Sequence, residues 1–278
     1  MRNFMLFWAL ALFFCSCQDK VPIVVPTSNP LNVFPQNFRR NVLLENVVGE
    51  WHAATVENSV MVAQLQAQFG SRLIVSTLHQ NDWLETAYTT YFIDRLGGLI
   101  GIPRAAINRR KGSGTILGED NLVLLSPENW TTAIERAMAT PAFLAISMET
   151  SVDSAHQATV NVNIAHKEAI FGDIRLLVYI VQNDIPALFQ QGGTTTFKHQ
   201  NVLKEVLTSY EGDTLNLNED FPLGEIRHKQ FTGINLTNYD VFQTRAIAVV
   251  YRYDVDFRKS EILNVQEVRM GGIKFWDL

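Results

Sequence analysis

The stretch that decides the fold is NVLLENVVGEWHAATV, residues 41–56. Its first half is a short apolar run that ends at Gly49, a pattern typical of a buried strand. Apolar side chains at helical spacing follow from Val56 to Phe69, and Gly70 ends that pattern. A strand joined by a short loop to a helix predicts that this part of the chain folds as an α/β unit.

The pattern continues for about eighty more residues. Residues 72–78 are rich in branched side chains and predict a second strand, and residues 83–96 predict a second helix. Gly101-Ile102-Pro103 leads into a third short strand at 104–108, and Lys111-Gly-Ser-Gly114 is typical of a turn at a hairpin tip. A last helix is expected from Pro127 to Met138.

This order of elements resembles a thioredoxin-like domain. In that fold the first strand leads to a Cys-x-x-Cys motif at a helix start, and a cis-proline from a later loop faces the motif. Glu45 and Gly49 match the Glu…Gly-x-x-Cys-x-x-Cys pattern of related proteins, and the two cysteine positions align onto His52 and Thr55. Pro103 takes the place of the cis-proline. The resemblance therefore implies the framework of the fold without its nucleophiles.

The texture of the sequence changes after residue 140. Short strand-like runs separated by turn residues, of which residues 157–165 alternate apolar or small residues with polar ones, predict an antiparallel β-sandwich. These runs are residues 142–149, 157–165, 174–181, 244–255 and 262–270. Residues 197–207 fit either a helical turn or an irregular strand. We therefore expect an α/β thioredoxin-like domain over 41–140, followed by an all-β antiparallel sandwich domain over 141–278.

The first sixteen residues have the pattern of a lipoprotein signal peptide. Arg2 supplies a positive charge, residues 4–14 are apolar, and the small Ser16 precedes Cys17. Cleavage before Cys17 would leave that cysteine as the acceptor of a lipid anchor. Residues 17–40 hold four prolines and predict an extended tether. The alternative is an ordinary secretory peptide with two incidental cysteines.

The cysteine count has a further consequence. The chain has two cysteines, at positions 15 and 17, so a mature chain that starts at Cys17 has no other thiol. Thiol catalysis and a thiolate metal site are therefore excluded from the folded body.

Four landmarks together resemble the Omp-28-related family of outer-membrane lipoproteins. They are residues 42–51, His79-Gln80-Asn81-Asp82, Gly101–Arg109 and the His-containing segment 197–207. The resemblance implies an exported lipoprotein with a thioredoxin-like half and a β-rich half. Some members keep the Cys-x-x-Cys motif, and its loss here removes the activity that the fold would suggest.

His52, His79 and Asp82 form the one candidate polar site. If their loops converge, two imidazoles and a carboxylate would suit a metal ion, although no paired ligand spacing supports this. The alternative is a polar loop left after cysteine loss, with Asp82 as the N-cap of the following helix. Lys111-Gly-Ser-Gly-Thr115 lacks the order of a phosphate loop, so a turn is expected there.

The expected function is binding or assembly at the cell envelope without catalysis, and without a metal or cofactor. The net charge is −5 and no basic run interleaves with aromatic residues, which argues against nucleic acid as a partner. The expected partners are the membrane, through the lipid, and an envelope protein, peptide or glycan. The expected location is the periplasmic or cell-surface face of the outer membrane. A metal-assisted hydrolase and a glycan- or peptide-binding surface protein are the alternatives.

Overall fold

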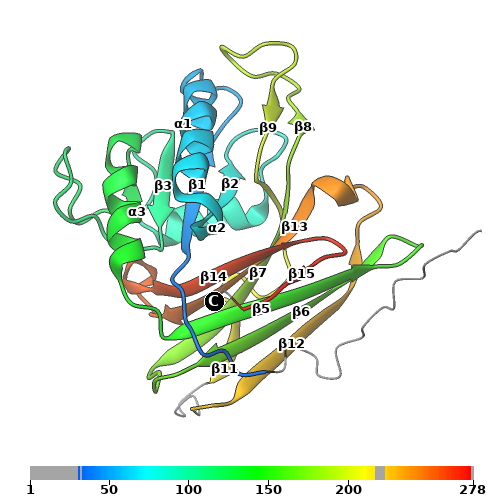
Figure 1. Cartoon of the computed structure of the whole chain (residues 1–278). Helices are drawn as coiled ribbons and strands as arrows, with labels where there is room; N and C mark the ends of the chain where they lie inside the picture. Colours follow the sequence, from blue (N-terminus) through cyan, green and yellow to red (C-terminus); the bar gives the residue numbers. More distant parts are fainter. Residues whose placement is uncertain (1–30, 32, 217–222, 277–278) are drawn as a thin grey trace, which may run out of the picture.

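The computed structural model describes residues 31, 33–216 and 223–276 (Figure 1). The expected signal peptide and the expected lipidation site at Cys17 lie outside the described residues. Up to residue 140 the chain alternates strands and helices. These elements are β1 (Val42–Val48), α1 (Ala54–Phe69), β2 (Leu73–His79), α2 (Ala87–Arg95), β3 (Arg104–Ile107), β4 (Leu124–Leu125) and α3 (Trp130–Ala139), with 3₁₀ turns at Gly70–Arg72 and Pro127–Asn129.

The rest of the described chain holds strands and two short 3₁₀ turns, Val241–Gln243 and Phe257–Lys259. The strands are β5 (Leu144–Val152), β6 (Gln157–His166), β7 (Asp173–Gln182), β8 (Ile185–Pro186), β9 (Lys198–His199), β10 (Val202–Val206), β11 (Asp213–Asn216), β12 (Ile226–Asn235), β13 (Thr244–Tyr253), β14 (Glu261–Arg269) and β15 (Ile273–Lys274). Residues 197–207 thus contain an irregular strand, because the register of β10 on β7 shifts between Leu203 and Glu205.

One sheet runs through both halves of the chain. Its order is β14-β13-β7-β10-β2-β1-β3-β4, and β11 pairs with β7. β1 is parallel to β2 and antiparallel to β3. β10 joins the halves, because it lies parallel to β2 at Val202 and Thr77 and antiparallel to β7. A second, antiparallel sheet has the order β12-β6-β5-β15, and β8 and β9 form a separate hairpin.

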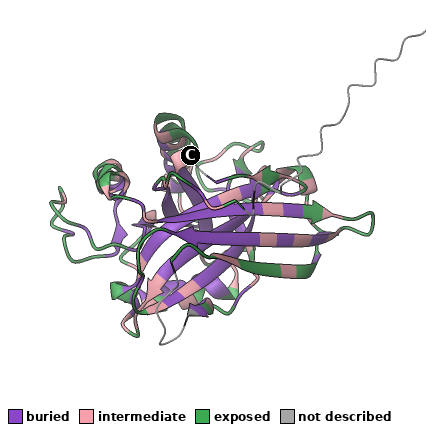
Figure 2. Cartoon of the chain, turned by 60° about the horizontal axis from the view of Figure 1, so that its bottom comes forward, coloured by how far each residue is buried: buried purple, intermediate pink, exposed green. Residues whose placement is uncertain are grey.

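The fold is therefore β-rich, with one mixed and one antiparallel sheet and few helices. The expected all-β sandwich holds for the four-stranded sheet, which faces β7 and β13 across an apolar core. The expectation of a purely antiparallel second region is wrong at β10, whose parallel partner β2 belongs to the first region. Figure 2 shows long buried stretches along the strands of both sheets.

Apolar faces explain the layers. α1 and α3 cover one face of β1, β2 and β3. Trp130 and Ile134 of α3 are fully buried against this face. α2 packs on the other face, where Phe92 lies in a core that continues onto β7 and β13. No helix within the described residues is long and apolar enough to cross a membrane.

The edge strand β14 returns to the start of β1. The backbone N–H of Asn41 donates to Asn264 Oδ1 at 2.9 Å, and its side chain donates to the carbonyl of Val265 at 3.0 Å. The described part of the expected tether is also packed, since Phe34 and Phe38 lie against Trp276 and the outer face of the four-stranded sheet. Both ends of the described chain are thus fixed to the same body.

A buried ion pair of the first half forms a hydrogen-bonded cluster with a tyrosine of the second half. The Arg109 guanidinium donates to both carboxylate oxygens of Glu45, at 2.9 and 2.7 Å, and both side chains are fully buried. It also donates to the hydroxyls of Tyr88 and Tyr179, at 2.9 and 2.8 Å. Burial disfavours the charge on Arg109, but Glu45, Tyr88 and Tyr179 together outweigh burial and hold the pKa of the guanidinium above its usual value. Because Tyr179 lies on β7, this cluster links the first region to the second.

α2 begins later than the sequence predicts. It starts at Ala87 instead of residue 83, and its N-cap position is Thr86, which makes no side-chain capping bond. The expected role of Asp82 as the helix N-cap is therefore wrong. Asp82 lies in the turn that precedes the helix, where its Oδ1 accepts from the backbone N–H of Leu84 at 2.8 Å.

Candidate functional site

Three segments meet at the carboxyl ends of β1 and β2. They are the loop between β1 and α1, the turn after β2, and the β8–β9 hairpin, which extends beside α1 (Figure 1). The carboxyl end of parallel strands is where α/β folds place their ligand sites. The hairpin belongs to the second half of the chain, so both halves contribute to this site.

His79 and Asp82 lie in contact, as one interpretation of the sequence requires. His79 is the last residue of β2 and is buried, and its Nδ1 lies 2.8 Å from Asp82 Oδ2. The same oxygen accepts from the backbone N–H of Glu50 at 2.9 Å. Burial raises the pKa of Asp82, but the hydrogen bond and charge of His79, with the backbone donors, outweigh burial and lower it. Asp82 thus joins the turn after β2 to the loop after β1.

A second imidazole–carboxylate pair lies beside the first. His199 Nε2 on β9 lies 2.9 Å from Glu50 Oε1, and both side chains are buried. The His79 and His199 rings meet edge to face, with centroids 4.5 Å apart. Burial, followed by the nearby His79, lowers the pKa of His199 despite the opposing effect of Glu50. Sequence reasoning missed Glu50 and His199 as partners, although both lie inside landmarks of the family resemblance.

Backbone and indole donors occupy the rest of the Glu50 carboxylate. Trp83 Nε1 donates to Oε1 at 3.1 Å, and the backbone N–H of Leu188 does so at 3.2 Å. The backbone N–H of Phe189 donates to Oε2 at 3.4 Å. A buried carboxylate with four donors is a structural acceptor that holds the β8–β9 loop over the end of β1.

His52 takes no part in this network. It is half-buried, and its Nδ1 accepts from the backbone N–H of Ala54 at 3.3 Å. No hydrogen bond or ion pair within the described residues joins His52 to His79 or Asp82. The structure therefore brings together two members of the candidate site and leaves the third apart. The described residues include no group of three or more His, Cys, Asp or Glu arranged to hold a metal ion.

Thr55, at the second cysteine position, is bonded locally. It is buried, and its hydroxyl donates to the carbonyl of Gly49 at 2.8 Å. His52 and Thr55 therefore both stabilise the connection between β1 and α1.

Pro103 lies at a groove beside the start of α1. The Ile102–Pro103 peptide bond is cis. The loop that carries it and the first turns of α1 line an open groove of about 520 Å³, to which Ala54, Met61 and Ile100 contribute apolar surface.

Large apolar side chains are exposed around the Glu50 network. Trp51 and Trp83 are 44% and 48% exposed, and Leu188 and Phe189 are 71% or more exposed. The indole N–H of Trp51 donates to the carbonyl of Gln80 at 2.8 Å. We call these four residues the aromatic rim. Their polar atoms are bonded inward while their apolar surfaces face solvent, an arrangement suited to binding.

Two solved structures resemble the fold over most of the chain. HBP35 of Porphyromonas gingivalis is 18% identical, with 84% of this chain and 76% of that chain covered and a TM-score of 0.69. Protein AGR_C_4864 of Agrobacterium tumefaciens is 11% identical, with 85% and 96% covered and a TM-score of 0.59. At these identities the likeness concerns the fold alone. A comparison with curated proteins gave no match.

The family comparison covers more than half of the chain. The model of the outer membrane protein Omp28 matches residues 87–274, from the start of α2 to β15. The site residues His199, Leu188 and Phe189 lie inside the match, whereas Glu50 and His79 precede it. The description of this family also gives the location, which is the outer membrane. The chain belongs to the Omp28 family of outer membrane proteins.

Proposed function

We propose that this protein is a non-catalytic binding or assembly lipoprotein of the outer membrane, with a redox-inactive thioredoxin-like first half. The order of strands and helices from β1 to α3 supports that fold, as do the central place of β1 between β2 and β3 and the cis-proline beside α1. His52 and Thr55 stand where the fold would carry its thiols, and neither has sulfur chemistry.

The observation that carries the binding role is the aromatic rim above a saturated polar network. The carboxylate oxygens of Glu50 and Asp82 accept hydrogen bonds from donors within the protein, so these residues hold loops in place. Trp51 and Trp83 remain about half exposed. Fixed, half-exposed tryptophans supply large contact area at low entropic cost and are enriched among residues that dominate binding energy.

An extended peptide segment of an envelope protein fits this end of the molecule best. The groove beside Pro103 is about 520 Å³ and open, and it begins at the same end of α1 that carries the loop of Trp51. Its wall includes Ile100, which is 70% exposed. A glycan is the second candidate, because the exposed faces of Trp51 and Trp83 offer stacking surfaces for sugar rings.

Site-specific photo-crosslinking in intact cells tests the proposal. A photoreactive residue at Phe189 should give a discrete adduct with an envelope protein, and Trp83→Ala should reduce that adduct strongly. The same probe at Lys229, an exposed position on β12, is the matched control. Equal adducts from both positions, or an adduct indifferent to Trp83→Ala, would contradict binding at the rim. A glycan array with the purified protein decides between the two ligand classes.

A disulfide assay tests the redox part separately. We expect the protein to leave insulin disulfides intact, since the folded body has no thiol. His52→Cys/Thr55→Cys should form a disulfide, detected by thiol titration, if the first half is thioredoxin-like. Activity in the unmodified chain would overturn the non-catalytic assignment.

A further inference from the structure

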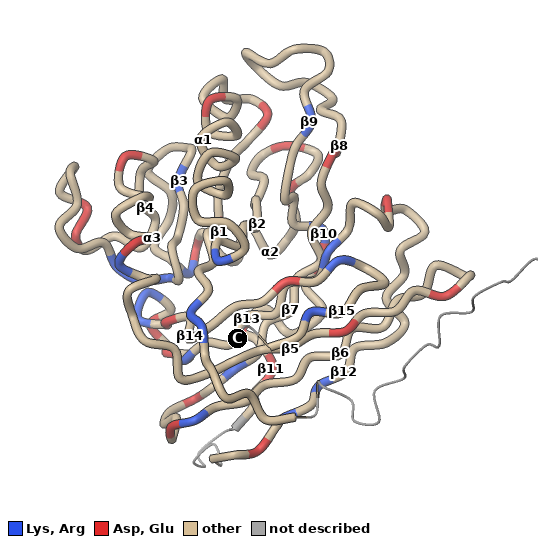
Figure 3. The backbone as a smooth tube through the Cα atoms, in the orientation of Figure 1, with Lys and Arg blue, Asp and Glu red and all other residues tan. Residues whose placement is uncertain are grey.

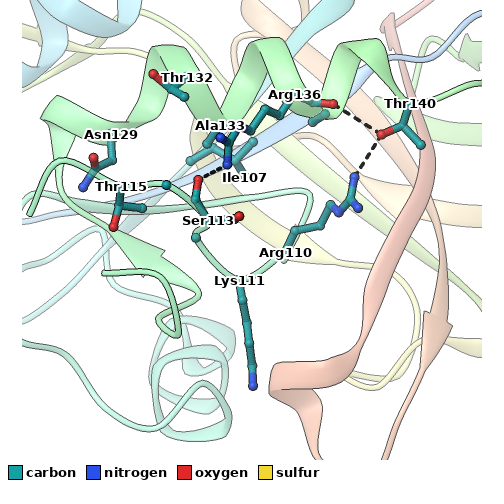
Figure 4. Close-up of a pocket in the computed structure, with 13 residues that line it drawn as sticks. Ile107, Arg110, Lys111, Ser113, Thr115, Asn129, Thr132, Ala133, Arg136 and Thr140 are labelled. Carbon is teal, nitrogen blue, oxygen red and sulfur yellow. Dashed lines mark hydrogen bonds between the residues drawn. The ribbon is translucent and has the colours of Figure 1, made fainter. Parts of the chain in front are cut away.

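The Lys111-Gly-Ser-Gly-Thr115 loop forms one wall of a cavity of about 260 Å³. α3 forms the facing wall through Thr132 and Arg136, and Ile107 at the end of β3 also lines the space (Figure 4). Neither the aromatic rim nor the Glu50 network contributes to this cavity. It is therefore a separate feature of the surface.

The cavity is lined by cations without an acidic residue. Arg110, Lys111 and Arg136 are among its thirteen lining residues, and none of the thirteen is Asp or Glu. The whole chain carries a net charge of −5, so the local sign is opposite to the average. One of these cations has an acidic partner outside the cavity. Arg110 Nε lies 3.4 Å from Glu261 Oε1, and Arg40 Nη2 lies 3.8 Å from the same oxygen.

Hydrogen bonds fix the two arginines in place. Arg110 Nη1 donates to the hydroxyl of Thr140 at 3.0 Å, and that hydroxyl donates to the carbonyl of Arg136 at 3.3 Å. Arg136 Nη1 donates to the carbonyl of Ser113. A guanidinium has five N–H donors, so each arginine keeps donors for a ligand. Lys111 extends away from α3 and has no hydrogen bond or ion pair with any described residue (Figure 4).

Two glycines allow close packing around the loop, Gly114 against α3 and Gly112 against the segment that contains Glu119. Gly114 has a φ of +60°, and a Cβ there would lie 2.8 Å from Arg136 Nη2. A Cβ on Gly112 would lie 2.6 Å from the carbonyl of Glu119. The Gly-Ser-Gly sequence therefore determines the shape of the cavity beside Arg136.

The positive surface extends toward β14. Arg110 and Lys111 also line an adjoining hollow of about 360 Å³ with Arg258 and Lys259. Asp256 lies 2.9 Å from Arg258 and 3.7 Å from Lys259, so it offsets part of their charge. Figure 3 shows basic positions gathered where the loops beside α3 and β14 lie.

We propose that this cavity binds the phosphate group of a small phosphomonoester. The forked guanidinium donors of Arg110 and Arg136 suit the oxygens and the double charge of phosphate. The volume exceeds the needs of one phosphate group and leaves room for a sugar or polyol. The loop is followed by β4, without the helix N-terminus of a nucleotide phosphate loop, so nucleoside triphosphates are not the ligand class.

Calorimetric titration of the full-length protein, purified from membranes in a non-ionic detergent, tests the site. We expect saturable one-to-one binding of glucose 6-phosphate and none of glucose. Arg110→Gln and Arg136→Gln should each weaken binding about tenfold or more, the effect of one charge-assisted hydrogen bond. Lys229→Gln makes the same charge change on β12 and should leave the affinity unchanged.

Gly114→Ala separates a built cavity from a diffuse positive surface, because it keeps every charge and displaces Arg136. It should weaken binding as much as Arg136→Gln while the melting temperature shows that the variant folds. Equal weakening by Lys229→Gln and Arg110→Gln, or no saturable binding, would overturn the proposal.

A vesicle arm identifies the source of the phosphate group. Phosphatidic acid vesicles are compared with phosphatidylcholine vesicles, so that a lipid anchor contributes equally to both. Preference for phosphatidic acid that Arg136→Gln removes supports a lipid headgroup, and binding of glucose 6-phosphate alone supports a soluble ester. A preference that survives Arg136→Gln counts against the site.

Discussion

Neutralising Glu45 should destabilise the protein strongly, because it leaves the Arg109 charge buried. Glu45→Gln keeps the shape of the side chain and removes its charge. Arg109 then has the hydroxyls of Tyr88 and Tyr179 and the ring of Phe257, whose centroid lies 4.8 Å from the guanidinium carbon. None of these is an anion, and the side chain of Arg109 is fully buried.

The magnitude follows from that burial. Removing one partner of a buried ion pair costs about 3–5 kcal/mol. For a chain of this size each kcal/mol lowers the melting temperature by about 2–4 °C. Glu45→Gln should therefore lower it by about 6–20 °C, measured by calorimetry at pH 7.

Two further variants isolate the cause. Glu45→Gln/Arg109→Met removes the stranded charge as well, so it should be more stable than Glu45→Gln alone. Asp256→Asn breaks an exposed pair with Arg258 and should not shift the transition measurably. If the double variant were less stable than Glu45→Gln, the argument from an uncompensated charge would be refuted.

Four other variants test the site, the core and the anchor. Because the pKa of folded His199 is lowered, its contribution to stability is present above its unfolded pKa, about 6.5, and is lost as pH falls through the folded pKa. His199→Phe should therefore reduce the fall in melting temperature between pH 7 and pH 5. Burial raises the pKa of Tyr88 to about 12, so stability is lost as pH rises from about 10 toward 12, and Tyr88→Phe should reduce that loss in alkaline unfolding. Gly49→Ala places a Cβ 2.5 Å from the Trp51 indole nitrogen, so it should cost about 1–3 kcal/mol in denaturant unfolding and shift tryptophan fluorescence. Cys17→Ser should release the protein from the membrane fraction and abolish metabolic labelling with palmitate, and membrane retention would argue for another anchor.

Apolar patterns predicted β1, α1 and β2 because each of these elements buries a local apolar face. They failed at the start of α2, where Trp83 and Leu84 continue the helical pattern but form a turn. Leu84 packs against Ile185 and Val202, and Asp82 bonds to the loop after β1. Contacts with distant residues decide that boundary, and a local pattern carries no information about them.

The sequence also did not predict which strands of the two halves pair with each other. The apolar runs at residues 174–181 and 244–255 indicate strands but do not show which strands pair with them. The link that fuses the two regions is the pairing of Val202 with Thr77, and β10 contains the register shift that made its segment ambiguous. A domain boundary placed at residue 140, where the sequence pattern changes, therefore does not reveal that one sheet contains strands from both sides of it.

Charged residues inside apolar stretches of the sequence indicate which positions need a polar partner in the fold. Glu45 interrupts an apolar strand, and a buried carboxylate requires a partner, so its position calls for a cation elsewhere in the core. That cation is Arg109, within one of the family landmarks. Glu50 and His199 likewise lie inside landmarks, which marks them as positions to be paired even though the pairing needs the fold.

The Glu50–His199 pair explains how the carboxyl end of β1, which has no thiols, comes to present an exposed apolar surface. A Cys-x-x-Cys motif has to be open to its substrate, whereas here the β8–β9 hairpin is held over this end by two backbone donors and one imidazole. That cover could not close over a working redox centre, and it places Leu188 and Phe189 beside Trp83. On the proposed function, the loss of the thiols and the gain of the aromatic rim are therefore two consequences of one arrangement, in which the second half of the chain completes the first.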